Sequence, residues 1–222
     1  SRVRRQSWES HSHSKIIGSA SATHFSEKRC SRCRMLKHLC YCSSLTSIDT
    51  KCLVSLIIHH VEFKKPTNTG HLVNLLLNNS DVVLRGWPKG FVVSEEILRP
   101  EYQPVLLYPS EQSSLLNKDF LHRWTKPIQL IVPDGNWNQA SKCVKRLDFL
   151  SALPHVRLEL SYESEYQIRR TSRPGGLATL EAVAYALEVI EGEATRDHLL
   201  KSFRQMVGQV LTARGKNLTS EH

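Results

Sequence analysis

Four cysteines near the start of the chain have the residue types and the spacing of a metal site. Cys30 and Cys33 form a C-x-x-C pair, and Cys40 and Cys42 form a tighter C-x-C pair. Tetrahedral Zn²⁺ prefers such thiolate ligands, and the Arg, Lys and His residues between them help to keep thiols deprotonated. The alternative is a pair of disulfides, which closely spaced cysteines form in secreted chains. We predict a zinc knuckle over residues 27–46.

Asp134 is the residue best suited to proton chemistry. It follows the apolar run Gln129 to Val132 in the sequence VPDGNW, so its carboxylate can project from a strand end into a pocket. The alternative is an ordinary turn, in which Asp and Gly are both common. Trp137 beside it is either a core anchor or a surface on which a base can stack.

Two further groups of side chains are candidates for chemistry. His59 and Glu62 follow another apolar run and form a second acid–base pair, the alternative being a histidine held by ordinary hydrogen bonds. Arg169, Arg170 and Arg173 lie in a basic loop, where they can hold RNA phosphates or a substrate carboxylate. The alternative for this loop is a solvated run of charge.

The elements that must position these residues alternate between strand and helix along the chain. Apolar runs predict strands at 53–60, 81–84, 104–107, 129–132 and 156–160. Helices are predicted after Thr67 or Asn68 and at 94–98, 138–147, 177–190 and 197–213. This alternation is typical of a parallel α/β sheet, which binds ligands at the carboxyl ends of its strands. The loops YPSEQ, PDGNW and RPGGLATLEA should meet there.

The net charge is the strongest signal in the composition. The 222 residues carry a formal charge of +9 in several clusters, which favours a polyanionic partner such as nucleic acid over a diffusely basic surface. The sequence contains no apolar run of about 18 residues, so no membrane-spanning helix is predicted. We expect a soluble intracellular protein, in the cytoplasm or nucleus. An organelle is the alternative, because an Arg- and Ser-rich start also suits a transit sequence.

The predicted loops suit an adenosine-sized cofactor, although the usual nucleotide fingerprints are missing. Neither G-x-x-x-x-G-K-[ST] nor G-x-G-x-x-G after a strand occurs. Leu107, Val132, Leu177 and Trp137 can form the apolar walls of such a pocket, with backbone groups as donors and acceptors. A nucleotide would therefore be bound in some other way.

The ordered set of motifs resembles the DTW-domain proteins, which are tRNA-uridine aminocarboxypropyltransferases. The motifs are HHVEFKKPTNTG, LYPSE, VPDGNW and RPGGLATLEA, in that order behind the cysteine knuckle. The resemblance runs from about Cys30 to about Ile190, and the ordered set is specific where no single motif would be.

The resemblance implies a SPOUT-like α/β domain with a trefoil knot near the carboxyl end. The knot loops would fold S-adenosylmethionine into a bent shape. The expected division is a flexible basic arm over 1–26, the zinc knuckle over 27–46 and a catalytic domain over 50–215. The expected assembly is a monomer or a homodimer.

The activity that the resemblance implies moves the 3-amino-3-carboxypropyl group of S-adenosylmethionine to N3 of a tRNA uridine and releases methylthioadenosine. The zinc would be structural, and Asp134 would be the base or its organiser. The cofactor-binding residues would be Tyr108, Pro109, Ser110, Pro133, Gly135, Asn136, Trp137, Leu177, Ala178, Thr179 and Glu181. The RNA-binding residues would be His59, Glu62, Thr67, Asn68, Arg169, Arg170 and Arg173.

The chain departs from the family pattern at two positions. Asn136 replaces the threonine of the Asp-Thr-Trp signature, and Ala178 replaces the serine of Ser-Thr-Leu-Glu-Ala, so a helix cap loses a hydroxyl. Two other functions remain open: a SPOUT-like RNA methyltransferase that uses the same cofactor, and a zinc-knuckle RNA-binding protein without catalysis.

Overall fold

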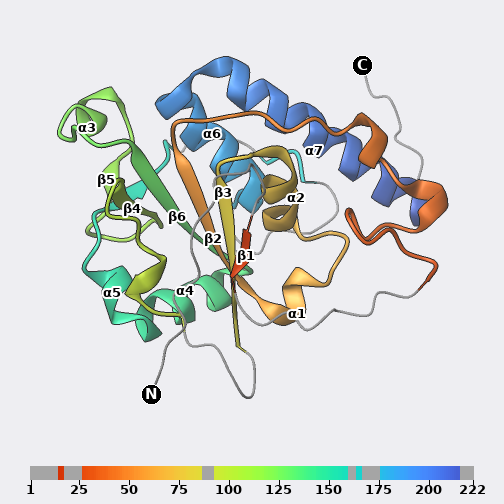
Figure 1. Cartoon of the computed structure of the whole chain (residues 1–222), viewed down its shortest axis with the longest axis horizontal. Helices are drawn as coiled ribbons and strands as arrows, with labels where there is room; N and C mark the ends of the chain where they lie inside the picture. The colour runs from red at the N-terminus through yellow and green to blue at the C-terminus, as the bar shows by residue number, and fades with distance from the viewer. Residues whose placement is uncertain (1–14, 18–26, 87–92, 160–163, 167–175, 216–222) are drawn as a thin grey trace, which may run out of the picture.

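The computed structural model describes residues 15–17, 27–86, 93–159, 164–166 and 176–215. Its strands are β1 (Lys15–Ile17), β2 (Leu53–His59), β3 (Ser80–Arg85), β4 (Gln103–Leu107), β5 (Ser114–Leu115), β6 (Ile128–Asp134) and β7 (His155–Arg157). Its helices are α1 (His60–Phe63), α2 (Thr69–Leu76), α3 (Lys118–Leu121), α4 (Trp137–Arg146), α5 (Asp148–Ser151), α6 (Thr179–Glu191) and α7 (Glu193–Ala213). Short 3-10 turns are η1 (Lys37–Leu39), η2 (Cys42–Ser44) and η3 (Glu95–Ile97). Figure 1 shows the arrangement.

β2 and β6 form the middle of a parallel sheet. Within the described residues the strand order is β1-β3-β2-β6-β4-β7-β5, and each pair of neighbours is parallel. Both central strands are mainly apolar and are buried along nearly their whole length. Strands with both faces covered have this composition. The parallel α/β sheet predicted from the sequence is confirmed.

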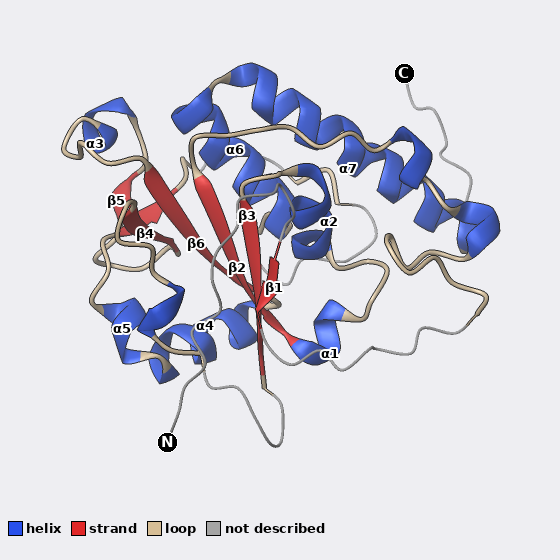
Figure 2. Cartoon of the chain, in the orientation of Figure 1, coloured by secondary structure: helices blue, strands red, loops and turns tan. Residues whose placement is uncertain are grey.

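Helices cover both faces of the sheet (Figure 2). Alternate residues of a strand point to opposite faces. Leu56 and Leu130 pack with α2, α6 and α7, whereas Ile57 and Ile131 pack with α4 and α5. Asp134 lies an even number of residues from Leu130, so its carboxylate points toward the layer of α2 and α6.

The carboxyl ends of β2 and β6 mark the point where the chain connections diverge. The chain leaves β2 through α1 and α2 to reach β3 on one side of the sheet centre. It leaves β6 through α4 and α5 to reach β7 on the other side. Open α/β sheets bind ligands at such a switch point. His59 ends β2 there, and Asp134 ends β6.

The cysteine-rich segment packs against the same core as the sheet and its helices. Met35, Tyr41 and Leu45 are buried in the cluster that contains the apolar faces of α2 and α7. The Ser44 hydroxyl accepts a hydrogen bond from Gln205 Nε2 of α7 at 2.6 Å. In Figure 1 this orange segment lies beside α7.

The ends of several elements differ from the prediction, and the difference at Asp134 is the one that matters for function. The expected loop over 133–137 is wrong, because Pro133 and Asp134 belong to β6 and α4 begins at Trp137. Asp134 lies opposite Ile58 of β2, so strand pairing continues to that residue. Asn136 then caps α4, which leaves Gly135 as the link between strand and cap.

Smaller differences occur elsewhere. The helix predicted at 94–98 is the single 3-10 turn η3, and the last helix begins at Glu193, earlier than expected. The strand predicted at 156–160 is shorter and spans His155–Arg157, so the prediction is wrong for Leu158 and Glu159, and residue 160 lies outside the described residues.

The amino-terminal segment and the knot are described only in part. Lys15–Ile17 pairs with β3 as strand β1, so part of the segment expected to be an arm joins the sheet. The trefoil knot stays a prediction, because much of the chain between β7 and α6 lies outside the described residues. Among the described helices, none is long and apolar enough to cross a membrane.

Candidate active site

Asp134 holds the amino ends of two helices to the end of β6. Its side chain is buried, and the residue is only 3% exposed. Asn68 Nδ2 donates to Asp134 Oδ2 at 2.6 Å, and the Thr179 hydroxyl donates to Asp134 Oδ1. Asn68 caps α2 and Thr179 begins α6. One carboxylate therefore joins three elements that lie far apart in the sequence.

The TNTG segment explains how α2 comes so close to Asp134. Asn68 Oδ1 accepts a hydrogen bond from the backbone N–H of His71 at 2.7 Å, as expected of an N-cap asparagine. A Cβ atom on Gly70 would lie 2.9 Å from Asp134 Cγ, too close for a side chain. The asparagine caps the helix and holds the carboxylate, while the glycine makes room for it.

A second buried carboxylate, Glu181, anchors the amino end of α6. It accepts hydrogen bonds from the Ala178 backbone N–H at 2.7 Å, from the Ser164 hydroxyl at 2.7 Å and from the Glu165 backbone N–H at 2.6 Å. Charge-assisted hydrogen bonds of this kind are the stronger class. In this structure Glu181 therefore positions residues 164–166 against the helix.

The segment 164–166 is also fixed from other directions. The Tyr166 hydroxyl donates to the Thr67 carbonyl at 2.9 Å, and its ring packs on Phe203 at 5.5 Å between centroids. Glu165 pairs with Arg204 of α7 at 2.6 and 2.7 Å, and this contact lowers the pKa of Glu165. The segment therefore connects the amino end of α2 to α6 and α7.

Aromatic rings gather on the opposite side of the strand ends. Tyr108 follows β4 and stacks on Trp137 at 5.3 Å with an interplanar angle of 13°. His155 meets the Tyr108 ring edge-on at 6.3 Å, and its Nδ1 lies 3.0 Å from the Ser110 hydroxyl. The motifs YPSEQ and PDGNW therefore meet through their rings at one edge of the sheet.

The predicted pair His59 and Glu62 lies at the end of β2 with both side chains engaged inside the protein. The His59 ring stacks on His60 and accepts a hydrogen bond from the Val61 backbone N–H at 3.3 Å. Burial and the nearby Arg85 lower the pKa of His59. Glu62 accepts from Lys65 Nζ at 2.6 Å.

The four knuckle cysteines form a cluster with the geometry of a tetrahedral zinc site. Their Sγ atoms all lie within 4.8 Å of one another, with Cys30 and Cys42 3.8 Å apart and Cys33 and Cys40 3.7 Å apart. A tetrahedron with Zn–S bonds of about 2.3 Å has S···S edges of about 3.8 Å. A disulfide bond would need about 2.05 Å, and all four thiols are free. The donor set and the spacing fit Zn²⁺.

The pKa values within the cluster favour a thiolate at Cys30. Burial raises the pKa of this thiol, but hydrogen bonds from the backbone of Cys33 and Arg32 outweigh it and bring the pKa to about 6. Burial raises the pKa of Cys33 and of Cys42. A bound cation deprotonates coordinating thiols outright.

Comparison with known proteins places this arrangement in a family. The chain matches the DTW domain over residues 27–211. It belongs to the DTW-domain family.

Two curated proteins align with most of this chain. Both carry the name tRNA-uridine aminocarboxypropyltransferase 2: the protein from Macaca fascicularis is 28% identical over 171 residues, and the one from Drosophila melanogaster is 29% identical over 170 residues. Each alignment covers 73% of this chain but only 56% and 66% of the respective relative. A mouse protein of the same name is 31% identical over 87 residues, which are 39% of this chain and 29% of that relative.

The segment predicted to carry the DTW signature joins β6 to α4, and the structure explains how Asn136 serves there. Asn136 Oδ1 accepts from the Gln139 backbone N–H at 2.9 Å, and Gln139 Oε1 accepts from the Asn136 backbone N–H at 2.8 Å. This is a capping box, in which threonine and asparagine both serve. Gly135 has φ +140°, and a Cβ there would lie 2.6 Å from Gln139 Oε1, so the glycine is required.

The second departure also has a local explanation. Ala178 caps α6 without a side-chain hydrogen bond, which confirms the loss predicted for this position. The Glu181 carboxylate accepts from the Ala178 backbone N–H instead, so half of a capping box remains.

Several DTW residues predicted to bind the cofactor lie at this sheet edge. Pro133 and Gly135 flank Asp134, Pro109 lies between Tyr108 and Ser110 after β4, and Leu177 precedes the cap of α6. The three predicted arginines, Arg169, Arg170 and Arg173, lie outside the described residues.

Two residues that the sequence analysis did not assign to the site connect the knuckle to it. His71 follows the TNTG motif and contacts the backbone of Arg32 and the guanidinium of Arg34. Arg34 is a non-glycine residue with φ +66° and is only 2% exposed. A buried arginine inside a basic run carries no distinguishing local signal, because such runs are usually solvated.

Proposed function

We propose that this chain transfers the 3-amino-3-carboxypropyl group of S-adenosylmethionine to N3 of a uridine in tRNA. The observation that carries the proposal is the convergence of the DTW motifs on Asp134 at the switch point of a parallel sheet. The names of the relatives support the same reaction. The chain spans 56% and 66% of the length of those two relatives.

The residues at the sheet edge fit the proposed cofactor. Leu107, Val132 and Ala178 belong to one apolar cluster and can contact an adenine ring, while the ends of β4 and β6 present backbone donors and acceptors. When bound, S-adenosylmethionine supplies a carbon activated by its sulfonium. The departing thioether is neutral, so the transfer itself requires no Lewis acid.

Asp134 is proposed to organise the site and, through that, the removal of the uridine N3 proton. Its carboxylate oxygens accept hydrogen bonds from Asn68 and Thr179, which hold α2 and α6 around the position where the reacting groups would meet. Fixed positioning of this kind lowers the barrier because the reactants need not be ordered in the transition state.

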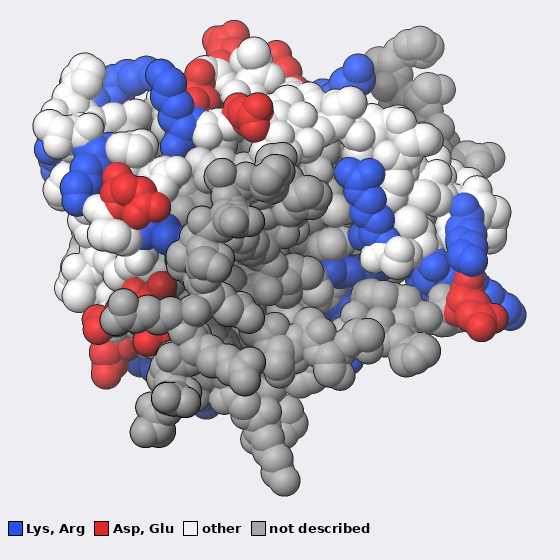
Figure 3. Space-filling view, in the orientation of Figure 1, with Lys and Arg blue, Asp and Glu red and all other residues white. Residues whose placement is uncertain are grey.

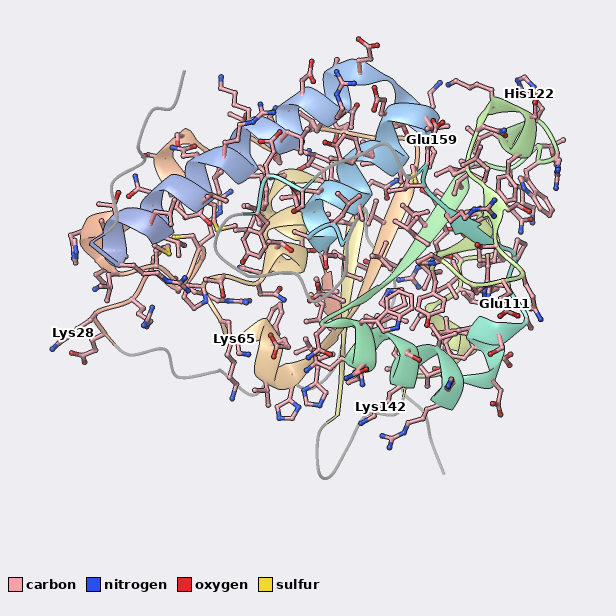
Figure 4. All side chains as sticks on the ribbon, turned by 180° about the vertical axis from the view of Figure 1, so that it is seen from behind. Lys28, Lys65, Glu111, His122, Lys142 and Glu159 are labelled. Atoms are coloured by element: carbon pink, nitrogen blue, oxygen red, sulfur yellow. The ribbon has the colours of Figure 1, made fainter. Side chains whose placement is uncertain are left out.

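Exposed basic side chains are proposed to bind the tRNA backbone. Figure 4 shows Lys28 of the knuckle at the left edge of the molecule, and Lys65 after α1 and Lys142 of α4 toward its lower edge. Figure 3 shows Lys and Arg side chains gathered on its left, over α3, and on its right, over the knuckle. Phosphate contacts from such groups position RNA and make binding sensitive to salt.

The cysteine cluster is proposed to hold a structural zinc ion through Cys30, Cys33, Cys40 and Cys42. Four thiolates complete a tetrahedral shell and leave no open position, as in structural rather than catalytic zinc sites.

The proposal is tested by incubating the protein with unmodified tRNA and S-adenosylmethionine and measuring the masses of the released nucleosides. A uridine carrying an aminocarboxypropyl group, together with methylthioadenosine, is the expected result. A matched reaction with Asp134→Ala controls for contaminating enzymes. Absence of modified uridine with tRNA from several sources would overturn the proposal.

The nucleoside masses distinguish the first of the two other functions, and a binding measurement distinguishes the second. A methyltransferase would produce a uridine heavier by one methylene unit and would release S-adenosylhomocysteine. A non-catalytic RNA-binding protein would bind tRNA without affinity for S-adenosylmethionine, which isothermal titration calorimetry measures directly.

A further inference from the structure

We propose that the zinc-loaded cysteine cluster positions the Asp134 site through His71, which is a positioning residue. A continuous series of hydrogen bonds runs from the backbone of the knuckle through His71 and Asn68 to Asp134. The effect on cofactor binding rests on the proposed function, whereas the effect on local structure does not.

The first link joins the knuckle to the ring of His71. Its Nε2 lies 2.6 Å from the Arg32 carbonyl oxygen, and its Nδ1 lies 3.0 Å from Arg34 Nη2. A guanidinium can only donate, so Nδ1 must accept, and Nε2 must carry the proton that it donates to the carbonyl. Both contacts therefore specify one neutral tautomer of a buried ring.

The knuckle backbone determines where these two partners lie. Arg32 and Arg34 flank the ligand Cys33, and the Arg34 backbone N–H donates to the Cys30 carbonyl at 2.9 Å. Arg34 has a left-handed backbone conformation, which persists in a non-glycine residue only where the surroundings enforce it. Its guanidinium also lies 3.8 Å over the ring of Phe63. A metal bound by Cys30 and Cys33 would enforce this loop shape.

The second link runs from His71 to the site. The backbone N–H of His71 donates to Asn68 Oδ1 at 2.7 Å, and Asn68 Nδ2 donates to Asp134 Oδ2 at 2.6 Å. The amide oxygen of Asn68 accepts one of these hydrogen bonds and its amide nitrogen donates the other. Only one orientation of the amide group therefore satisfies both. The position of His71 thus sets the direction of the Asn68 side chain.

The third link is steric. Because a Cβ on Gly70 would lie 2.9 Å from Asp134 Cγ, the amino end of α2 is already in close contact with the carboxylate. A shift of α2 away from the knuckle would therefore change the contacts of Asp134, and through the Thr179 hydroxyl those of α6. The knuckle acts on the site through packed groups at each step.

The test compares His71→Ala with His71→Gln in the full chain. The glutamine amide can donate to the Arg32 carbonyl in place of Nε2, whereas alanine can make neither side-chain contact. His38→Ala is the matched control, because His38 is an exposed residue of the same knuckle. Zinc content, amide hydrogen exchange and the affinity for S-adenosylmethionine are measured for each protein.

The expected result is that His71→Ala retains one zinc per chain but exchanges faster in the peptides that cover 68–73 and 128–134. Its affinity for S-adenosylmethionine should fall about tenfold, as for one lost buried hydrogen bond, and His71→Gln should recover part of both effects. Removing zinc from the unsubstituted protein should accelerate exchange in the same two peptides. Removing zinc from His71→Ala should cause little further increase in the exchange rates of these two peptides, because the coupling is already lost.

Four other outcomes are informative, and each one decides either the proposal or the measurement that tests it. If zinc removal changes exchange only within 27–46, or if His71→Ala behaves like His38→Ala, the proposal is wrong. If zinc removal also exposes β4, the whole fold has opened, and the comparison of the two His71 variants with zinc bound decides instead. If the unsubstituted protein fails to bind S-adenosylmethionine, the proposed function fails, while the exchange data still test the coupling.

Discussion

The two sides of the strand ends are built by different kinds of interaction. Toward α2 and α6, Asp134 and Glu181 are buried carboxylates whose oxygens accept hydrogen bonds from the protein. Toward α4, Tyr108, Trp137 and His155 meet through their rings. Hydrogen bonds to a buried charge specify one geometry, because an unmet bond is costly, whereas ring contacts tolerate small displacements. The polar side should therefore determine the shape of the site, and the aromatic side should adapt to what binds.

The largest expected effect comes from Asp134→Asn. The amide cannot accept at both of its positions, so either Asn68 or Thr179 loses its partner. We expect kcat/KM with tRNA to fall by at least about 100-fold and the free energy of unfolding to fall by about 1–3 kcal/mol. Nucleoside mass analysis and urea denaturation measure the two. Unchanged turnover would show that the polar side does not control the reaction.

The polar side should also be sensitive to acid through His71. Burial and the charge of Arg34 lower the pKa of His71 from 6.5 to about 3, so the unfolded chain binds a proton that the folded chain does not. Stability should therefore be unaffected above pH 6.5 and should decrease as the pH falls toward 3. The loss attributable to this residue should reach about 3 kcal/mol two units below its normal pKa. Urea denaturation of His71→Gln, with zinc measured in parallel, should lack that part of the decrease.

Glu181→Gln should affect structure more than chemistry. A glutamine amide has only one oxygen, so one of the three donors loses its acceptor. The free energy of unfolding should fall by about 1–2 kcal/mol, and residues 164–166 should become less ordered. Thermal unfolding and limited proteolysis are the measurements. Glu159→Gln is the control, because Glu159 is exposed. Equal effects of the two substitutions would contradict the role of Glu181 in positioning residues 164–166.

Trp137→Leu probes the aromatic side with a smaller expected effect. Leucine keeps much of the apolar contact but removes the stack on Tyr108, which should cost about 1 kcal/mol. Trp137→Phe keeps a ring and should cost less. Thermal unfolding with and without S-adenosylmethionine measures both. A decrease in stability as large as that of Asp134→Asn would show that the aromatic side is no more tolerant than the polar side.

Asn136→Thr should have the smallest effect, because it restores the family residue at a cap that either side chain can form. The free energy of unfolding should change by less than about 0.5 kcal/mol. Cofactor affinity from calorimetry should also stay the same. A large gain in affinity would mean that the threonine hydroxyl contacts the cofactor directly.

Much of the fold was predictable because its signals are local. The apolar run that became β2, the asparagine that caps α2 and the spacing of the four cysteines each depend on residues close together in the chain. The end of β6 was misjudged because Asp-Gly is a common turn pair, and only pairing with β2 keeps Asp134 in the strand.

The sequence by itself determined the alternating elements, the four knuckle cysteines and Asp134 as a candidate residue, since each follows from residue type and short-range spacing. Only the tertiary structure decided which groups meet that carboxylate. Asn68 and Thr179 lie 66 and 45 residues from Asp134, and His71 lies 39 residues from Arg32. Such contacts depend on strand order and on which face each helix covers, and packing of the whole chain sets both.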